Sequence, residues 1–288
     1  MKRAELAVRL VEASDTGREV LLRDNIALAD VQLAHILKDL CLDGWTRHPS
    51  QALGAAATLL LLSGIDPDRE IAALHAWSSG LAALVNGQME HAVEKLDQSH
   101  ERFLLLDKPV FAAATQVSKL VALSILGRYD EAIECGLVAR EVFLTQGDQL
   151  AAGKIEHNIG NLCFRRDRYH EAEKFQTIAR ERFTALNDQK QLAAINICLA
   201  NTHALLHKFK SAEDLYEQAV QQAETAGLPV ALAGIEGNIG TLALLQGRYD
   251  RALDYLERAR RRYASLGMAD QSATAEQDIA DAYLELAN

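Results

Sequence analysis

The stretch HNIGNLCFRRDRYHEA, residues 157–172, returns in modified form as GNIGTLALLQGRYDRA at residues 237–252. Both contain Asn-Ile-Gly, then Arg-Tyr and then an alanine in the same register, 80 residues apart. Steps of 40 residues from that alanine give an unbroken series: Ala52, Ala92, Ala132, Ala172, Ala212 and Ala252. A repeat of this length indicates a solenoid, in which each unit packs mainly on its neighbours.

Each repeat divides into two amphipathic segments. Residues 152–166 and 169–186 carry apolar side chains at helical spacing, and a break at Asp167 separates them. Gly147 and Asn187 follow second segments, where a residue that adopts the left-handed conformation ends a helix. No stretch alternates apolar and polar residues with period two, so the sequence predicts an all-α fold of helix pairs.

Small residues recur at fixed positions within both helices of the repeat. The first helix carries Gly80, Gly160 and Gly240 in one register, and the second helix carries the alanine series. A glycine inside a helix is unfavourable by about 1 kcal/mol relative to alanine. Its recurrence therefore predicts a close crossing of the two helices.

These residues resemble the tetratricopeptide repeat (TPR) family. Asn158, Gly160 and Tyr169, followed by Ala172 and Ala179, resemble the family's signature of small residues and a tyrosine. The usual TPR unit has about 34 residues, so a 40-residue unit is a longer variant, similar to those of spindle-orientation adaptors and kinesin light chains. The resemblance implies an all-α, right-handed superhelical solenoid of antiparallel helix pairs that binds proteins or peptides.

The resemblance is greatest to the N-terminal TPR arrays of bacterial proteins that carry a caspase-like CHAT domain. The segments that carry it are GRYDEA (127–132), GRYDRA (247–252), DIADAYLEL (278–286) and the leader LVEASDTGREVLLRDN (10–25). This resemblance implies that the chain is the sensing half of a larger signalling or protease system, possessing no catalytic half itself. Whether Asn288 is a natural end stays open.

The repeat predicts three regions along the chain. Residues 1–27 form an N-terminal helical cap, residues 28–268 form six 40-residue helix pairs, and residues 269–288 form a closing helix. Thr16 and Glu19 have the spacing of a capping box, which predicts that Thr16 opens a short helix within the cap.

Bulk composition excludes several classes of protein. A formal net charge of −10 argues against a nucleic-acid binder. The longest apolar run, Ala52–Ile65, is shorter than the roughly 20 residues that a membrane span needs. The four cysteines lack CxxC spacing, which favours reduced cysteines and a cytoplasmic protein.

Several local patterns imitate functional sites. Gly234, Gly237 and Gly240 lie inside one predicted helix, whereas a nucleotide loop needs a preceding strand. His203 and His207 have the spacing of metal ligands but no third ligand at an obvious distance. No serine or cysteine lies in the local context of an activated nucleophile. The sequence therefore predicts no enzyme activity, no cofactor and no metal site.

Arginines cluster in the predicted helix 249–266. They could form a stripe that binds phosphate or acidic groups, or an ordinary solvated helix face. They are Arg251, Arg258, Arg260, Arg261 and Arg262.

The TPR resemblance implies where a partner binds, because in that family the first helix of each pair lines a concave groove. The corresponding groove residues are Trp77 at an apolar entrance, then Lys154, His157, Asn158, Asn161, Arg165, Asn201, Asn238 and Thr241. Asparagine both donates and accepts hydrogen bonds, so a ladder of asparagines satisfies a peptide backbone whose unpaired buried groups would cost about 1–3 kcal/mol each. The alternative is that these asparagines tie neighbouring helices or face water.

The sequence thus favours a non-enzymatic scaffold that recognises a protein or an extended peptide in a concave groove. The alternative is a sensor of a small molecule or signalling peptide that gates an attached regulator. A receptor for acidic chaperone tails is disfavoured, because Cys198 and Gly234 interrupt the row of cations that such a clamp needs.

Overall fold

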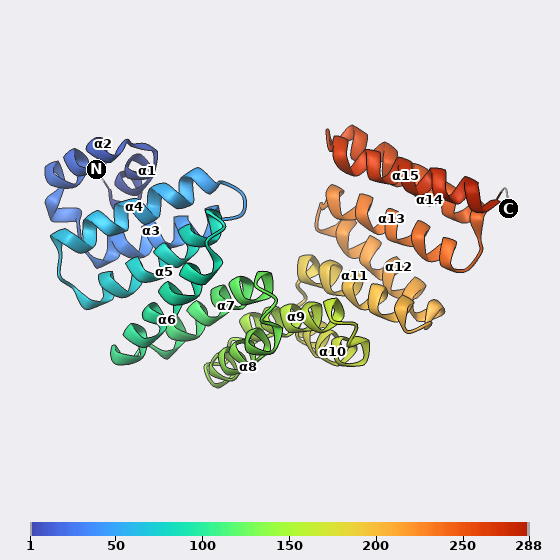
Figure 1. The fold of residues 1–288 in the computed structure, drawn as a ribbon, viewed down its shortest axis with the longest axis horizontal. Helices are drawn as coiled ribbons and strands as arrows, with labels where there is room; N and C mark the ends of the chain where they lie inside the picture. Colours follow the sequence, from blue (N-terminus) through green and yellow to red (C-terminus); the bar gives the residue numbers. More distant parts are fainter. Residues whose placement is uncertain (1, 287–288) are drawn as a thin grey trace. The chain divides into compact units, whose positions relative to one another are not determined.

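A computed structural model describes residues 2–286, which contain fifteen α-helices, one 3-10 helix and no strand (Figure 1). The prediction of an all-α fold is confirmed. The first helices along the chain are α1 (Arg3–Glu12), α2 (Asp15–Asp24), η1 (Ile26–Leu28), α3 (Val31–Gly44) and α4 (Pro49–Ile65). The following helices are α5 (Arg69–Val85), α6 (Met89–Leu105), α7 (Pro109–Ile125), α8 (Tyr129–Thr145), α9 (Gln149–Arg165), α10 (Tyr169–Ala185), α11 (Gln189–Leu205), α12 (Phe209–Thr225), α13 (Pro229–Leu245), α14 (Tyr249–Ser265) and α15 (Ala269–Leu286).

The helices follow the period of the sequence. From α5 to α14 each helix spans 17 residues. The first helices of successive pairs begin 40 residues apart, and so do the second helices. Pro109 and Pro229 occupy the first turns of α7 and α13, where the missing N–H is not needed.

The turns between helices also repeat. One residue with positive φ ends each helix from α5 to α14, a glycine in six turns and Asp107, Asp167, Asn187 or His207 in the others. After Asp167, for example, the N–H of Arg168 donates to the carbonyl of Cys163 at 3.0 Å and closes the helix end. The predicted capping box is wrong, because α2 begins at Asp15 and Ser14 Oγ accepts from the N–H of Gly17 at 3.3 Å. Ser14 precedes the helix by one residue, and this places it, rather than Thr16, at the cap.

The small residues lie where paired helices cross. All six alanines of the series are fully buried. A Cβ atom on Gly240 would lie 2.6 Å from Cγ of Leu256 and 3.3 Å from the carbonyl oxygen of Ala252. A side chain cannot occupy that space, so the glycine is required by the approach of α13 to α14.

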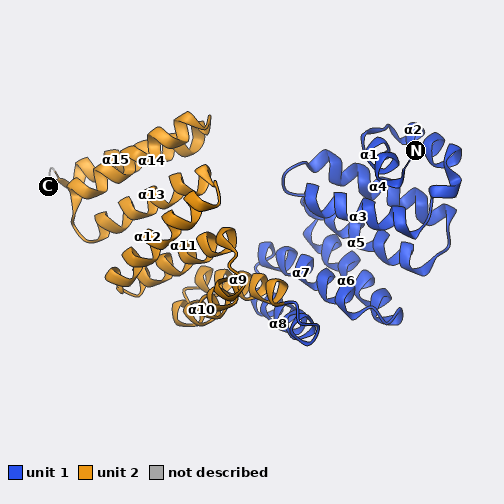
Figure 2. Cartoon of the chain, turned by 180° about the vertical axis from the view of Figure 1, so that it is seen from behind, with its two compact units in different colours: residues 1–148 blue, residues 149–288 orange. Residues whose placement is uncertain are grey.

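The chain divides into two compact units, unit 1 (residues 1–148) and unit 2 (residues 149–288), coloured separately in Figure 2. In unit 1, Phe103 packs against Trp77 and Phe111 at ring-centroid distances of 6.2 and 5.2 Å. In unit 2, buried side chains of α11, α12 and α13 form a continuous cluster that includes Tyr216 and Ile235. Each unit therefore has a core of its own.

Two further properties bear on the class of protein. Within the part of the chain that the structure describes, no helix is both long and apolar enough to cross a membrane. None of the four cysteines is in a disulfide, and burial raises the pKa of Cys41 to about 12. Burial also raises the pKa of Cys135 and Cys198, whereas a reactive cysteine has a lowered pKa.

Candidate functional site

The predicted groove residues of unit 2 come from three helices that each open a pair. Lys154, His157, Asn158, Asn161 and Arg165 lie on α9, Asn201 lies on α11, and Asn238 and Thr241 lie on α13. Their spacing of three or four residues puts those of one helix on one side of it. We call this side of α9, α11 and α13 the first-helix face.

Two hollows lie next to each other on the first-helix face. Hollow A, of about 180 Å³, is lined by Phe164, Asn201, Ala204, Leu205, Tyr216, Asn238, Thr241, Leu242 and Leu245. Hollow B, of about 240 Å³, is lined by Asn161, Phe164, Arg165, Gln176, Cys198 and Asn201. Phe164 and Asn201 border both hollows, so the two are adjacent. The structure brings together five of the predicted residues: Asn161, Arg165, Asn201, Asn238 and Thr241.

Two asparagines that line the hollows, Asn201 and Asn161, are each oriented by a hydrogen-bond partner. Oδ1 of Asn201 accepts a hydrogen bond from the hydroxyl of Tyr216. Burial raises the pKa of Tyr216, so this hydroxyl stays protonated and donates. The amide nitrogen of Asn201 is left to donate into the hollows. Asn161 hydrogen-bonds the thiol of Cys198, whose pKa burial nonetheless raises to about 11.

Other polar side chains of the face have no partner within the protein. Asn158, Asn238, Lys154 and Arg165 make no hydrogen bond or ion pair with any residue between 2 and 286. Asn158 and Asn238 are half-buried, whereas Lys154 and Arg165 are exposed. The interpretation that the asparagines tie neighbouring helices therefore fits Asn161 and Asn201, and does not fit Asn158 or Asn238.

His157 faces the next first helix rather than a hollow. Its Nε2 lies 3.3 Å from Sγ of Cys198 on α11. Burial lowers the pKa of His157, so the ring is neutral at pH 7. His157 thus links α9 to α11 and supplies no positive charge to a ligand.

The prediction that Trp77 lines the entrance of the groove is wrong. Trp77 is 3% exposed, and its Nε1 donates to Oγ of Ser118 at 3.1 Å. The ring packs edge-on against Phe103 in the core of unit 1. A bulky apolar side chain at this register turns into the core, because burial of a large aromatic ring is strongly favourable.

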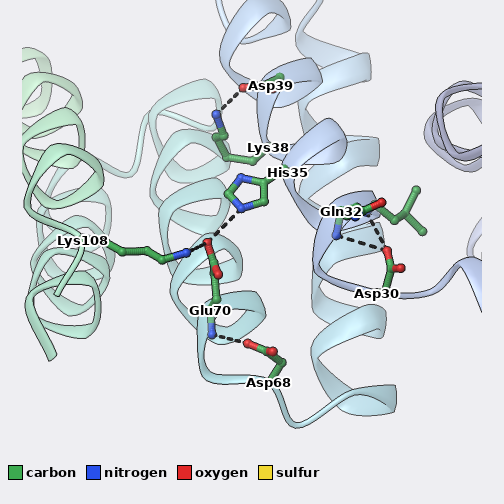
Figure 3. Close-up of polar contacts among 9 residues, drawn as sticks. Asp30, Gln32, His35, Lys38, Asp39, Asp68, Glu70 and Lys108 are labelled. Atoms are coloured by element: carbon green, nitrogen blue, oxygen red, sulfur yellow. Dashed lines mark hydrogen bonds and ion pairs between the residues drawn. The ribbon is translucent and has the colours of Figure 1, made fainter. Parts of the chain in front are cut away.

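Unit 1 contains a polar cluster on α3, α5 and α7, shown in Figure 3. Glu70 lies between two bases: its Oε1 is 2.9 Å from Nε2 of His35, and it also pairs with Lys108. Lys38 pairs with Asp39 and lies 5.3 Å from the centre of the Trp77 ring. Each charge here is matched within the protein, so the cluster fixes three helices and presents no open binding group.

The other patterns in the sequence also have structural roles. Nε2 of His203 lies 2.9 Å from Oε1 of Glu173, and its Nδ1 lies 2.9 Å from Oγ of Ser211. Both ring nitrogens are engaged, which leaves none for a metal ion shared with His207. The three glycines of α13 lie inside a regular helix, as the sequence indicated.

The arginines of α14 form ion pairs with glutamates. Arg258 and Arg262 both pair with Glu236, which is 3% exposed. Arg251 pairs with Glu213, and Arg260 and Arg261 pair with Glu257. The row is therefore part of an ion-pair network and not a stripe of free positive charge.

Comparison with known proteins agrees with this architecture. Tetratricopeptide repeat models match residues 151–225 and 237–266. These matches support the tetratricopeptide repeat family. A comparison with curated protein sequences finds no match.

Solved structures show the same fold at low sequence identity. BtubC (BKLC) from P. vanneervenii is 18% identical over 77% of this chain and 92% of its own, with a TM-score of 0.65. A Rap protein complexed with competence and sporulation factor is 14% identical over 98% of this chain and 84% of its own, with a TM-score of 0.58. A signal transduction ATPase with numerous domains and a TPR sensor, from Pyrococcus horikoshii, is 12% identical over 98% of this chain and 43% of its own, with a TM-score of 0.69. The chain is thus an all-α TPR solenoid of antiparallel helix pairs.

Sequence reasoning missed the apolar part of the site. Phe164, Tyr216, Leu205 and Leu245 line the hollows, and none was predicted. Leu205 and Leu245 occur 40 and 80 residues after Arg165, in the register of a predicted groove residue. Exposed leucines in that register were the signal that could have identified them.

Proposed function

We propose that the first-helix face of unit 2 binds an extended segment of a partner protein or a peptide, and that this face is the concave groove of the array. The observation that supports it is the adjacent pair of hollows A and B, bordered by Asn201 and by Asn238, whose side chain makes no hydrogen bond with any residue between 2 and 286. A ligand that covers these amides has to supply hydrogen bonds in place of water, and a peptide backbone offers both donors and acceptors.

The chemistry of the two hollows suggests how such a segment is held. Hollow A takes an apolar side chain against Phe164, Leu205 and Leu245. The amides of Asn158, Asn201 and Asn238 pair with the backbone of the segment, because each amide donates and accepts. Arg165 at hollow B pairs with an acidic group of the ligand.

Two structural neighbours support a binding role. The Rap protein was solved as a complex with competence and sporulation factor, and the P. horikoshii protein carries its repeats as a sensor. By analogy, this chain is non-enzymatic and works by recognition.

We place this binding face in a larger system. The chain acts in the bacterial cytoplasm as the sensing half of a signalling or protease assembly, with a caspase-like CHAT domain downstream of Asn288. Sequencing the native gene beyond the codon for Asn288 tests this placement. An open frame with a histidine and a cysteine in a caspase-like pattern supports it, and a stop codon at that point contradicts it.

A selected peptide tests the binding face itself. Peptides isolated from a random displayed library with the full chain are measured against N158A/N238A, which removes two amides that make no side-chain hydrogen bond with residues 2–286. We expect binding about 10- to 100-fold weaker, since two hydrogen bonds of about 0.5–1.5 kcal/mol each are lost.

The control is K174A, an exposed residue of α10 away from the hollows. Circular dichroism checks that both variants are folded. Equal affinity of the wild type and N158A/N238A for every selected peptide would show that the first-helix face of unit 2 is not the binding face.

The alternative function, a sensor of a small molecule, predicts a different result. A ligand at 100 times its dissociation constant adds about 2.7 kcal/mol to the free energy of unfolding. A metabolite that raises the melting temperature of the wild type and not of N158A/N238A would favour that alternative. We expect that only peptides raise the melting temperature in this way.

A further inference from the structure

A buried polar side chain recurs on the first helix of successive pairs. Gln116, Glu156, Asn196 and Glu236 are 40 residues apart, and all are buried. A buried polar group needs hydrogen-bond partners. In unit 2 partners lie on neighbouring second helices: on α10 for Glu156, on α10 and α12 for Asn196, and on α14 for Glu236.

Arg180, in the preceding helix pair, supplies a hydrogen bond to one of these buried groups, Asn196. It lies on α10, and its Nε donates to Oδ1 of Asn196 on α11 at 2.7 Å. Its Nη2 donates to Oε1 of Gln218 on α12 at 2.8 Å. The guanidinium therefore bridges α10 and α12 across α11.

One period later the bridging arginine is absent. The residues equivalent to Arg180, Asn196 and Gln218 are Val220, Glu236 and Arg258. Valine is too short to bridge α12 and α14, and a hollow of about 310 Å³ occupies the place. This hollow C is lined by Glu217, Val220, Gln221, Glu224, Leu232, Glu236, Ile239, Tyr255, Arg258 and Arg262.

The lining of hollow C combines an apolar wall with an excess of negative charge. Val220, Leu232 and Ile239 supply the apolar wall. Three carboxylates, those of Glu217, Glu224 and Glu236, face two guanidinium groups, those of Arg258 and Arg262.

The two arginines are already committed to the buried carboxylate. Arg258 and Arg262 donate to Glu236 at 2.9–3.0 Å. Glu217 and Glu224, on the exposed side, make no hydrogen bond or ion pair with any residue between 2 and 286. The charge of Glu224 helps to raise the pKa of Arg262, and the lining as a whole carries one more carboxylate than guanidinium groups.

We propose that hollow C binds an arginine side chain of a partner protein, in the space beside Val220, where the preceding period has Arg180. The aliphatic stem packs on the apolar wall, and the guanidinium pairs with Glu217 and Glu224. Arginine fits better than lysine, because its planar fork donates to two carboxylates at once. The site lies between second helices α12 and α14, and shares no lining residue with hollows A and B, so it stands or falls independently of the proposed function.

The first test is a titration of the full chain, followed by NMR, with N-acetyl-arginine amide. The matched control probe is N-acetyl-citrulline amide, which has nearly the same shape and no charge. We expect saturable shifts centred on Val220 and Tyr255, and at least about tenfold weaker binding of the citrulline compound, since hydrogen bonds between charged groups are lost. No saturable binding, or equal binding of the two compounds, overturns the proposal.

The second test fills the hollow from within. V220R restores the residue type found at Arg180 and should abolish binding of the arginine probe. V230R makes the same substitution at an exposed residue of α13 and should leave binding unchanged. Binding to V220R with wild-type affinity overturns the proposal.

A third variant keeps the test valid if V220R does not fold. E217Q/E224Q changes two exposed side chains only and should weaken probe binding about tenfold or more. Unchanged affinity of E217Q/E224Q contradicts the assigned pairing.

Discussion

Gly240 shows at the level of one residue why the repeat is so regular. It lies in α13 at the crossing with α14, where a Cβ atom would come within 2.6 Å of Leu256. Gly237, three residues earlier in the same helix, has open space, and its Cβ would lie 3.9 Å from that of Ala259. The two glycines belong to one helix and differ only in what they face.

This difference predicts opposite effects of the same substitution. G240A should lower the free energy of unfolding by about 1–3 kcal/mol through overpacking. G237A should raise it by up to about 1 kcal/mol, because alanine favours the helix. Urea denaturation followed by circular dichroism measures both, and equal effects of the two substitutions would argue against a tight crossing at Gly240.

Trp77 shows that the register of a repeat does not predict which way a side chain points. Trp77 and His157 occupy the same position in their repeats, 80 residues apart. His157 is half-buried and contacts Cys198, while Trp77 lies in the core of unit 1. Register locates the Cα atom on the helix, whereas the size of the side chain and its neighbours decide whether it faces a ligand or the core.

At the level of helices, α14 shows how the fold accommodates a row of arginines on one helix. Each arginine of the row pairs with a glutamate, and Glu257 holds Arg260 and Arg261 together. Hydrogen bonds from these arginines lower the pKa of Glu257 to about 2, against the raising effect of burial.

This shift predicts a pH dependence with a definite sign. The carboxylate of Glu257 stabilises the folded state above its unfolded pKa of about 4.5. That contribution is lost as the pH falls from about 4.5 through about 2. NMR titration of the Glu257 side chain should give a midpoint near 2, and a midpoint near 4.5 would show that the pair with Arg260 does not form in solution.

The helices themselves were predictable, and the reason is steric. Glycine or another residue with positive φ ends each helix from α5 to α14 at a fixed position, so the period fixes the bounds of these helices. The ion pairs between helices were not predictable, because Glu236 and Arg262 are 26 residues apart and nothing in the local sequence links them.

At the level of the whole chain, unit 2 has its own core and holds hollows A, B and C. We therefore expect residues 149–288 to fold alone. Expression of this segment should give a helical spectrum, a cooperative thermal transition and the same affinity for selected peptides as the full chain. A segment that is unfolded would show that residues 1–148 are needed for its stability.

The side of the helix on which a residue lies was predictable, but the partner was not. The register of Asn158 and Asn238 puts both amides on the first-helix face, and their role in binding stays a prediction. The chemistry of a partner depends on side chains that vary between repeats, such as Leu205 in the register of Arg165.

The central claim is that the first-helix face of unit 2 binds an extended segment. The most direct measurement is an NMR titration of the full chain with a selected peptide, observing the side-chain amide signals of asparagine. Our account predicts saturable shifts of Asn158, Asn201 and Asn238 at one common dissociation constant. Saturable binding that leaves these three signals unchanged would contradict it.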